Sequence, residues 1–168
     1  MITATTPVFP NNVIDITKTR VELLDADLKV FRRPLRDTDP NQSVGIFATQ
    51  WVPDEESHEM LGNAPGGMGS FHDPSIDRYL CAVQAFVKHM DEEVGLATHS
   101  VLSEMLRTML YRDTALRVGL SSLATELNGV RKRTTRWGIS QQRYFSNELT
   151  GSFLYLSTLE FWLETETT

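Results

Sequence analysis

The four histidines are the first residues to test for chemistry. His58 and His72 share one stretch with several carboxylates, and imidazole and carboxylate groups together can hold a metal ion. No two histidines, however, have the H-x-x-x-H or H-x-H spacing that places two imidazoles on one element. No serine or cysteine partner for nucleophilic catalysis can be identified for His89 or His99. The histidines therefore predict neither a metal centre nor a catalytic triad.

Three other groups of residues have chemical potential but a simpler structural explanation. Pro65-Gly66-Gly67-Met68-Gly69 is rich in glycine, yet no Lys-Ser or Lys-Thr follows it and no helix is expected behind it to bind phosphate. Asp91-Glu92-Glu93 precedes a predicted helix, where acidic side chains favour the positive end of the helix dipole. Cys81, the single cysteine, lies in an apolar run typical of a small buried hydrophobe. We therefore expect no enzyme activity and no cofactor.

The most informative charges form a basic stretch near the end of the chain: Arg131, Lys132, Arg133, Arg136 and Arg143. A solvated edge strand that its charges protect from aggregation is one interpretation. Contact with another protein is a second, with acidic residues of a neighbouring copy, such as Glu160 and Glu164, as partners. Direct contact with DNA is the third. All three stay open on the sequence alone.

Overall composition limits the classes of partner. A formal net charge of −6 argues against nucleic acid as the main ligand, because phosphate binding depends on excess Lys and Arg. Apolar runs are far shorter than the ~20 residues that span a bilayer, and residues 1–10 do not have the pattern of a signal peptide. We therefore expect a protein of the cytoplasm with no membrane partner, and 168 residues fit one domain.

The periodicities predict an α+β domain with a largely antiparallel sheet, in the order helix, three strands, helix, two strands. An N-terminal arm over 1–11 precedes a single domain over 12–168, which has a long loop at about 53–75. The predicted helices cover about 12–25, capped by Asn12, and about 94–111. The predicted strands cover about 28–33, 43–52, 76–90, 130–145 and 151–164, the first two forming a hairpin and the third lying centrally; the stretch 116–127 is ambiguous between a strand and a helical turn.

The long loop is the second candidate contact region. Its prolines and glycines break any regular pattern, and a connection of this length is uncommon unless it is functional or disordered. We expect it to project from the domain and to become ordered against a neighbouring chain. Its candidate contact residues are the large apolar and imidazole side chains Trp51, His58, Met60, Met68, Phe71 and His72.

The chain order resembles that of the tail terminator proteins of long-tailed bacteriophages. The resemblance lies in the strands 28–33 and 43–52, the strand 79–89 leading into the helix 95–112, and the closing strands. There, Arg143-Tyr144-Phe145-Ser146-Asn147 is followed by the run from Gly151 to Glu160. In such proteins a comparable final strand follows an Arg-bearing strand and ends the domain. The segment 53–75 and the N-terminal arm depart from the shortest members.

This resemblance implies a structural virion protein that forms a homo-hexameric ring. The ring would cap the tail tube and join it to the head connector, so the expected partners are other copies of the chain, the tail-tube protein and a head-side connector protein. DNA would pass through the lumen without sequence-specific binding. The expected location is the tail or neck of the virion, assembled in the host cytoplasm. The alternative is a head-completion or connector (stopper or adaptor) protein of the phage neck, and an uncharacterised enzyme is the alternative of a different class.

Overall fold

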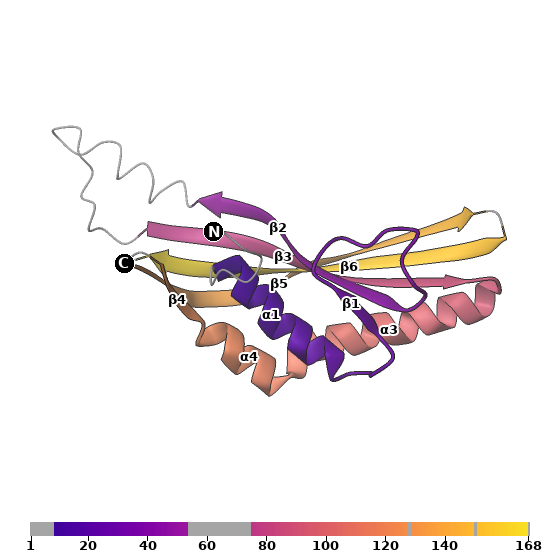
Figure 1. Ribbon diagram of the computed structural model, residues 1–168, viewed down its shortest axis with the longest axis horizontal. Coiled ribbons are helices and arrows are strands. Elements are labelled where there is room, and N and C mark those ends of the chain that lie inside the picture. The colour runs from indigo at the N-terminus through magenta and orange to yellow at the C-terminus, as the bar shows by residue number, and fades with distance from the viewer. Residues whose placement is uncertain (1–8, 54–74, 128, 150, 168) are drawn as a thin grey trace.

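The computed structural model describes residues 9–53, 75–127, 129–149 and 151–167. Within these ranges, helices pack against one side of a long, twisted sheet (Figure 1). The elements in chain order are α1 Phe9–Glu22, β1 Lys29–Phe31, β2 Ser43–Pro53, β3 Ser75–His89, α3 Glu92–Arg112, α4 Thr114–Ser121, β4 Ala124–Leu127, β5 Val130–Leu149 and β6 Ser152–Thr167.

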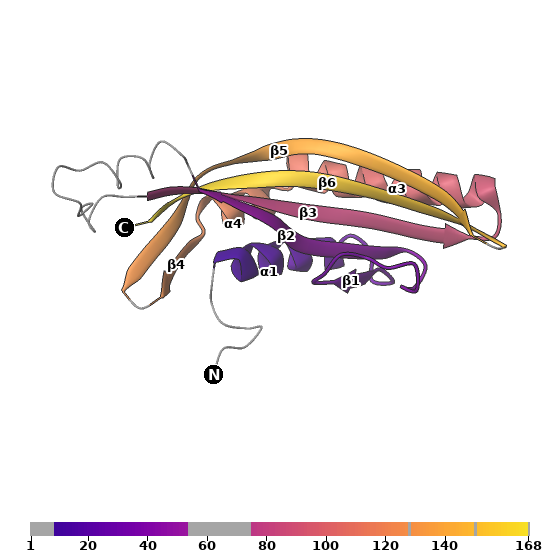
Figure 2. The same cartoon turned by 90° about the horizontal axis from the view of Figure 1, so that it is seen from above.

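The strands form one mixed sheet in the order β1-β2-β3-β6-β5-β4. β1 and β2 are parallel, and the other neighbours are antiparallel. β3 and β6 pair along their whole length at the centre, from Ser75 opposite Thr167 to His89 opposite Phe153. β5 curls, so that the β4–β5 hairpin bends away from the other strands (Figure 2).

The predicted fold class and element order are wrong at the junction after α3. The observed order is helix, three strands, two helices, three strands, because α4 and β4 occupy the stretch that the sequence left ambiguous. Asp113 explains the break: its backbone ends α3, and its side chain accepts a hydrogen bond of 2.8 Å from the Leu116 amide at the start of α4. An Asp cap at this position favours a new helix over a strand.

The predicted hairpin of the first two strands is also wrong, since β1 and β2 run parallel. The connection between them crosses the sheet face opposite the helices, where the Leu35 amide donates to Gln84 Oε1 at 2.9 Å. Within the connection, the Arg33 guanidinium holds both oxygens of Asp39, at 2.8 and 2.6 Å. These contacts stabilise a crossover that turn-forming residues alone did not distinguish from a hairpin loop.

The hydrophobic core lies between the helices and the sheet face that they cover. Alternate residues of β3 and β6 point into it, including Val83, Phe161 and Leu163, which are fully buried. α1 begins at Phe9, so Asn12 lies within the helix and is not its cap. The strand predicted over 76–90 and the helix predicted over 94–111 match β3 and α3 closely. Among the described helices, none is both long and apolar enough to cross a membrane.

Candidate interaction surface

The basic residues of β5 lie opposite the acidic residues of β6 in the same chain. On the sheet face away from the helices, which we call the open face, the guanidinium–carboxylate distances are 2.7 Å for Arg133–Glu166 and 3.0 Å for Arg136–Glu164. The longer Arg143–Glu160 pair measures 3.9 Å. We call these three pairs the ion-pair ladder. They are cross-strand pairs of the kind that stabilise antiparallel sheets.

Two β-bulges place these arginines on one face. In a regular strand, strict alternation would put Arg136 on the face opposite to Arg133 and Arg143. Register shifts between Thr134 and Arg136, and again between Ile139 and Gln141, each insert an extra residue into β5. A bulge reverses the faces of the residues that follow it, so all three arginines come to lie over the glutamates of β6.

Glu164 is the most enclosed member of the ladder. Its carboxylate accepts from Arg136 Nε at 3.0 Å and from the Thr135 hydroxyl at 3.3 Å, and it also lies 3.5 Å from an Arg78 guanidinium nitrogen. The hydrogen bonds from Arg136 are the main reason that the pKa of Glu164 lies below its ordinary value, although its burial opposes this shift. Charges that are already paired in this way have little left to offer a neighbouring chain.

The start of β5 differs from the ladder. Lys132 Nζ donates to the Tyr79 hydroxyl at 2.7 Å and lies 5.0 Å from the centre of the same ring. Arg131 pairs through its backbone with β4, where Glu126 lies opposite it, but its exposed side chain makes no ion pair with any residue in the described part of the chain. It follows Gly129, whose φ of +80° allows the tight turn between β4 and β5, and Val130, which is 51% exposed. We call Gly129, Val130 and Arg131 the hairpin tip.

The remainder of β5 is an open sheet edge. β4 pairs only with residues 130–133 of β5, so in the described structure residues 135–149 have β6 as their single strand neighbour. Residues 140–148 are all exposed, and among them Tyr144 and Phe145 expose 54% and 57% of their surface. An unpaired strand edge with exposed aromatic side chains is a template for pairing with another chain.

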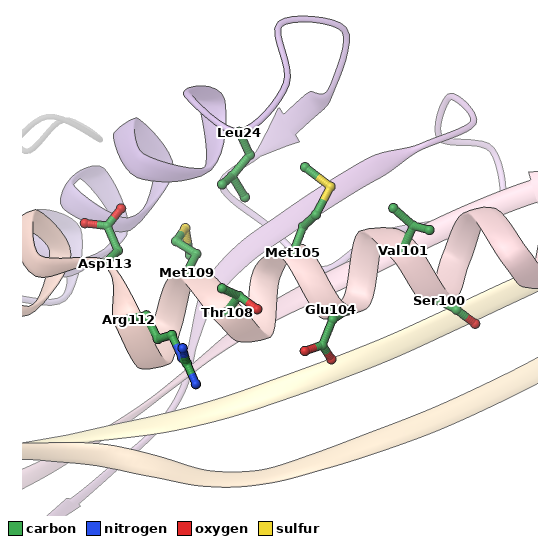
Figure 3. A pocket seen from close by; sticks show the side chains of 9 residues that line it. All are labelled: Leu24, Ser100, Val101, Glu104, Met105, Thr108, Met109, Arg112 and Asp113. Atoms are coloured by element: carbon green, nitrogen blue, oxygen red, sulfur yellow. The ribbon is translucent and has the colours of Figure 1, made fainter.

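A groove runs along α3 on the helical side of the molecule. Its larger part has a volume of about 740 Å³ and lies between α3 and the turn after α1, where Leu24 faces Met105 and Met109 (Figure 3). A second hollow of about 320 Å³ continues it toward Ala97 and shares Val101 and Met105 with the larger part. We call both parts together the α3 groove. Its floor is apolar, and methionine adapts readily to different partners.

Charged side chains border the α3 groove unequally. Asp25, Glu104 and Asp113 line it, whereas Arg112 is the one cation in the lining of the two hollows. Asp113 already pairs with Arg20 at 2.8 Å, and Glu104 lies 3.9 Å from Arg107. Of the three carboxylates, Asp25 makes no ion pair among the described residues, and the exposed Glu104 is only loosely held, so these two are the groups that a positively charged partner could reach.

One histidine makes contacts that the sequence did not indicate. His99 Nε2 lies 3.3 Å from Ser103 Oγ, which in turn lies 2.8 Å from Ser157 Oγ. All three side chains are buried, and burial lowers the pKa of His99. They form a hydrogen-bonded link between α3 and β6 that is closed to solvent. Within the described ranges, no three potential metal ligands lie close enough together to hold an ion.

The two predicted contact regions have different outcomes. The basic and acidic residues of the first are brought together, but within one chain. Of the second, Trp51 lies in β2, while His58, Met60, Met68, Phe71 and His72 lie outside the described residues, as does most of the predicted loop. An edge strand was one interpretation of the basic stretch, but the sequence did not single out Tyr144 and Phe145 on that edge, and it did not indicate the α3 groove. The available signal for the groove was the run of apolar residues on α3 that continues beyond one face, at Val101 and Met105.

No protein-family model matches the chain, and no curated protein matches its sequence.

Proposed function

We propose that this chain is a structural subunit of a long-tailed bacteriophage that assembles into a ring, as tail terminators do, capping the tail tube and joining it to the head connector. The observation that carries the proposal is the open edge of β5, which exposes its backbone and two aromatic side chains over residues 135–149. β2 lies toward the opposite edge of the same sheet, and its residues beyond Gly45 pair only with β3 among the described strands. Contact surfaces on opposite flanks are what a closed head-to-tail ring requires.

The ion-pair ladder fits this proposal in a different way from the one the sequence suggested. Glutamates of β6 neutralise arginines of β5, so the open face carries little surplus positive charge in this region. A surface of this kind does not retain phosphates strongly, because affinity for DNA depends on unneutralised Lys and Arg. A ring with the open face toward its lumen would let DNA pass without binding it.

Mass measurement of the full-length chain tests the proposal. By size-exclusion chromatography with light scattering, and by electron microscopy with purified tail tubes, we expect a hexameric ring or ring-capped tubes. Phe145→Lys places a charge at the open edge and should abolish the ring, because the substituted side chain is already exposed and the fold is preserved. Val118→Lys is the matched control, since Val118 is 60% exposed but lies on α4 and is not part of the β5 strand edge.

A native chain that stays monomeric and caps no tubes contradicts the proposal. Binding to head connectors without binding to tail tubes would instead identify a head-completion protein of the neck. Loss of the ring in Val118→Lys as well would show that the β5 edge is not the specific contact.

A further inference from the structure

The hairpin tip and the α3 groove are complementary in polarity and in charge. The hairpin tip presents an exposed aliphatic side chain, Val130, beside Arg131, whose side chain lies opposite Glu126 but makes no ion pair among the described residues. The α3 groove presents an apolar floor at Met105 and two carboxylates that remain accessible, Asp25 and the exposed Glu104, whereas Asp113 is held by Arg20. The hairpin tip therefore offers an apolar side chain and a positive charge, and the α3 groove offers an apolar floor and carboxylates.

Within one chain the two surfaces belong to different flanks. The hairpin tip joins β4 to β5 at one edge of the sheet. The α3 groove is bounded by the turn that leads from α1 into β1, the strand at the opposite edge. Figure 2 shows the β4–β5 hairpin bending away from the sheet, which leaves it free to reach another molecule. A contact between two different surfaces of identical chains is heterologous, and such contacts generate rings.

We propose that the hairpin tip of one copy docks in the α3 groove of the next copy, with Val130 against Val101 and Met105 and with Arg131 beside Asp25 and Glu104. The inference rests on the proposed ring and specifies which surfaces meet at one point of its interface. Val101, 62% exposed in the single chain, becomes covered in this contact. Arg131 gains the carboxylate partners that its neighbours Arg133 and Arg136 already have within the chain.

Disulfide trapping between separately labelled chains tests the contact. Full-length Val130→Cys is mixed with full-length Val101→Cys, and the mixture is oxidised. The native thiol does not interfere, because Cys81 is fully buried and its burial raises the pKa of the thiol to about 12. A disulfide requires Cβ atoms within roughly 4.5 Å of each other, so it forms only where the two surfaces touch.

The expected result is a covalent dimer at twice the chain mass of 19.0 kDa in the mixture, and not with either variant alone. Val130→Cys mixed with Val118→Cys is the matched control, because Val118 is as exposed as Val101 but lies outside the α3 groove. Equal dimer yield with the control, or no dimer with the groove variant, overturns the inference.

The native chain measured in parallel separates this inference from the proposed function. If the native chain forms a ring but the groove variant gives no specific dimer, the docking contact is wrong and the ring proposal stands. If neither a ring nor a dimer forms, both are wrong. A specific dimer without a ring supports the contact and contradicts ring closure.

A charge exchange gives a second readout that does not depend on cysteine. Arg131→Glu should reduce the fraction of assembled chains, and Glu104→Arg in the same chain should restore it, because the pair is reversed rather than removed. Failure of the second substitution to restore assembly contradicts a direct contact between these two positions.

Discussion

The two ends of the basic stretch have opposite relations to the rest of the chain. At the ladder, Arg133 and Arg136 are held by glutamates of β6, and Glu164 is nearly enclosed by its donors. At the hairpin tip, two residues away, the Arg131 side chain makes no ion pair among the described residues and adjoins an exposed valine. A cluster of charges in a sequence is thus not one surface. Charged side chains that form ion pairs within the chain stabilise the fold. Those that form none are the better candidates for contact with another chain.

The largest effect is expected in the α3 groove, where buried and exposed lining residues should differ in their contribution to the free energy of unfolding. Met109 is 3% exposed and belongs to the core as well as to the groove, so Met109→Ala should lower the free energy of unfolding by about 2–5 kcal/mol. Val101→Ala should change it by no more than about 0.5 kcal/mol, because its side chain is mostly exposed. Denaturant unfolding of both variants measures the contrast. Similar losses of free energy in the two variants would show that Val101 also belongs to the core.

An intermediate effect is expected in the ladder. Glu164→Gln should lower the free energy of unfolding by about 1 kcal/mol at neutral pH, since the charge-assisted bonds are lost but the arginine partners remain solvated. The folded-state pKa of Glu164 lies below its unfolded value, so this contribution is present above the unfolded pKa, near 4.5, and is lost as the pH falls through the folded pKa. Unfolding curves of native and variant chains should therefore converge in acid. A difference that persists there would mean that packing, and not the charge, is responsible. Glu148→Gln, at an exposed position on β5, is the control.

The smallest effects on stability, and the sharpest test of the contrast, come from single charge reversals in the basic stretch. Arg133→Glu removes an exposed pair and should cost at most about 1 kcal/mol, and Arg131→Glu, which brings a second carboxylate opposite Glu126, should also stay within about 1 kcal/mol. Assembly should follow the reverse order, with Arg131→Glu impairing the ring and Arg133→Glu leaving it intact. Melting curves beside a tail-capping assay measure both properties. If Arg133→Glu impaired capping more than Arg131→Glu, the ladder and not the hairpin tip would be the interface.

Elements with a strong period in the sequence could be predicted. α3 has apolar residues at helical spacing from Leu102 to Leu110, and Asp91 accepts a bond from the Val94 amide at its start, so its existence and limits were readable. β3, β5 and β6 are long strands, so their alternation of residue types remains recognisable even where single positions depart from it. The strand neighbours of these elements were harder to predict, because strand pairing depends on residues far apart in the chain.

The remaining features depend on geometry that no local pattern carries. β1 has three residues and lies parallel to β2 only because the connection between them crosses the sheet near Gln84. The ladder depends on two bulges, and a bulge leaves no mark in alternation until the partner strand is known. The sequence therefore showed that basic and acidic residues gather in the last strands, but it could not tell which of them are paired within the chain.

The position of β6 has a consequence for how the protein acquires its fold during synthesis. β6 is the last of the described elements to leave the ribosome, yet it lies between β3 and β5, and its partners in β3 precede it by more than sixty positions, as with His89 and Phe153. Until β6 emerges, β3 and β5 lack their main strand neighbour, so the nascent chain holds unpaired apolar strands. Folding that waits for such distant pairing is slow, on the order of milliseconds to seconds, and exposes the chain to aggregation meanwhile. Chaperone dependence during expression is the expected physiological cost of placing the final strand at the centre of the sheet.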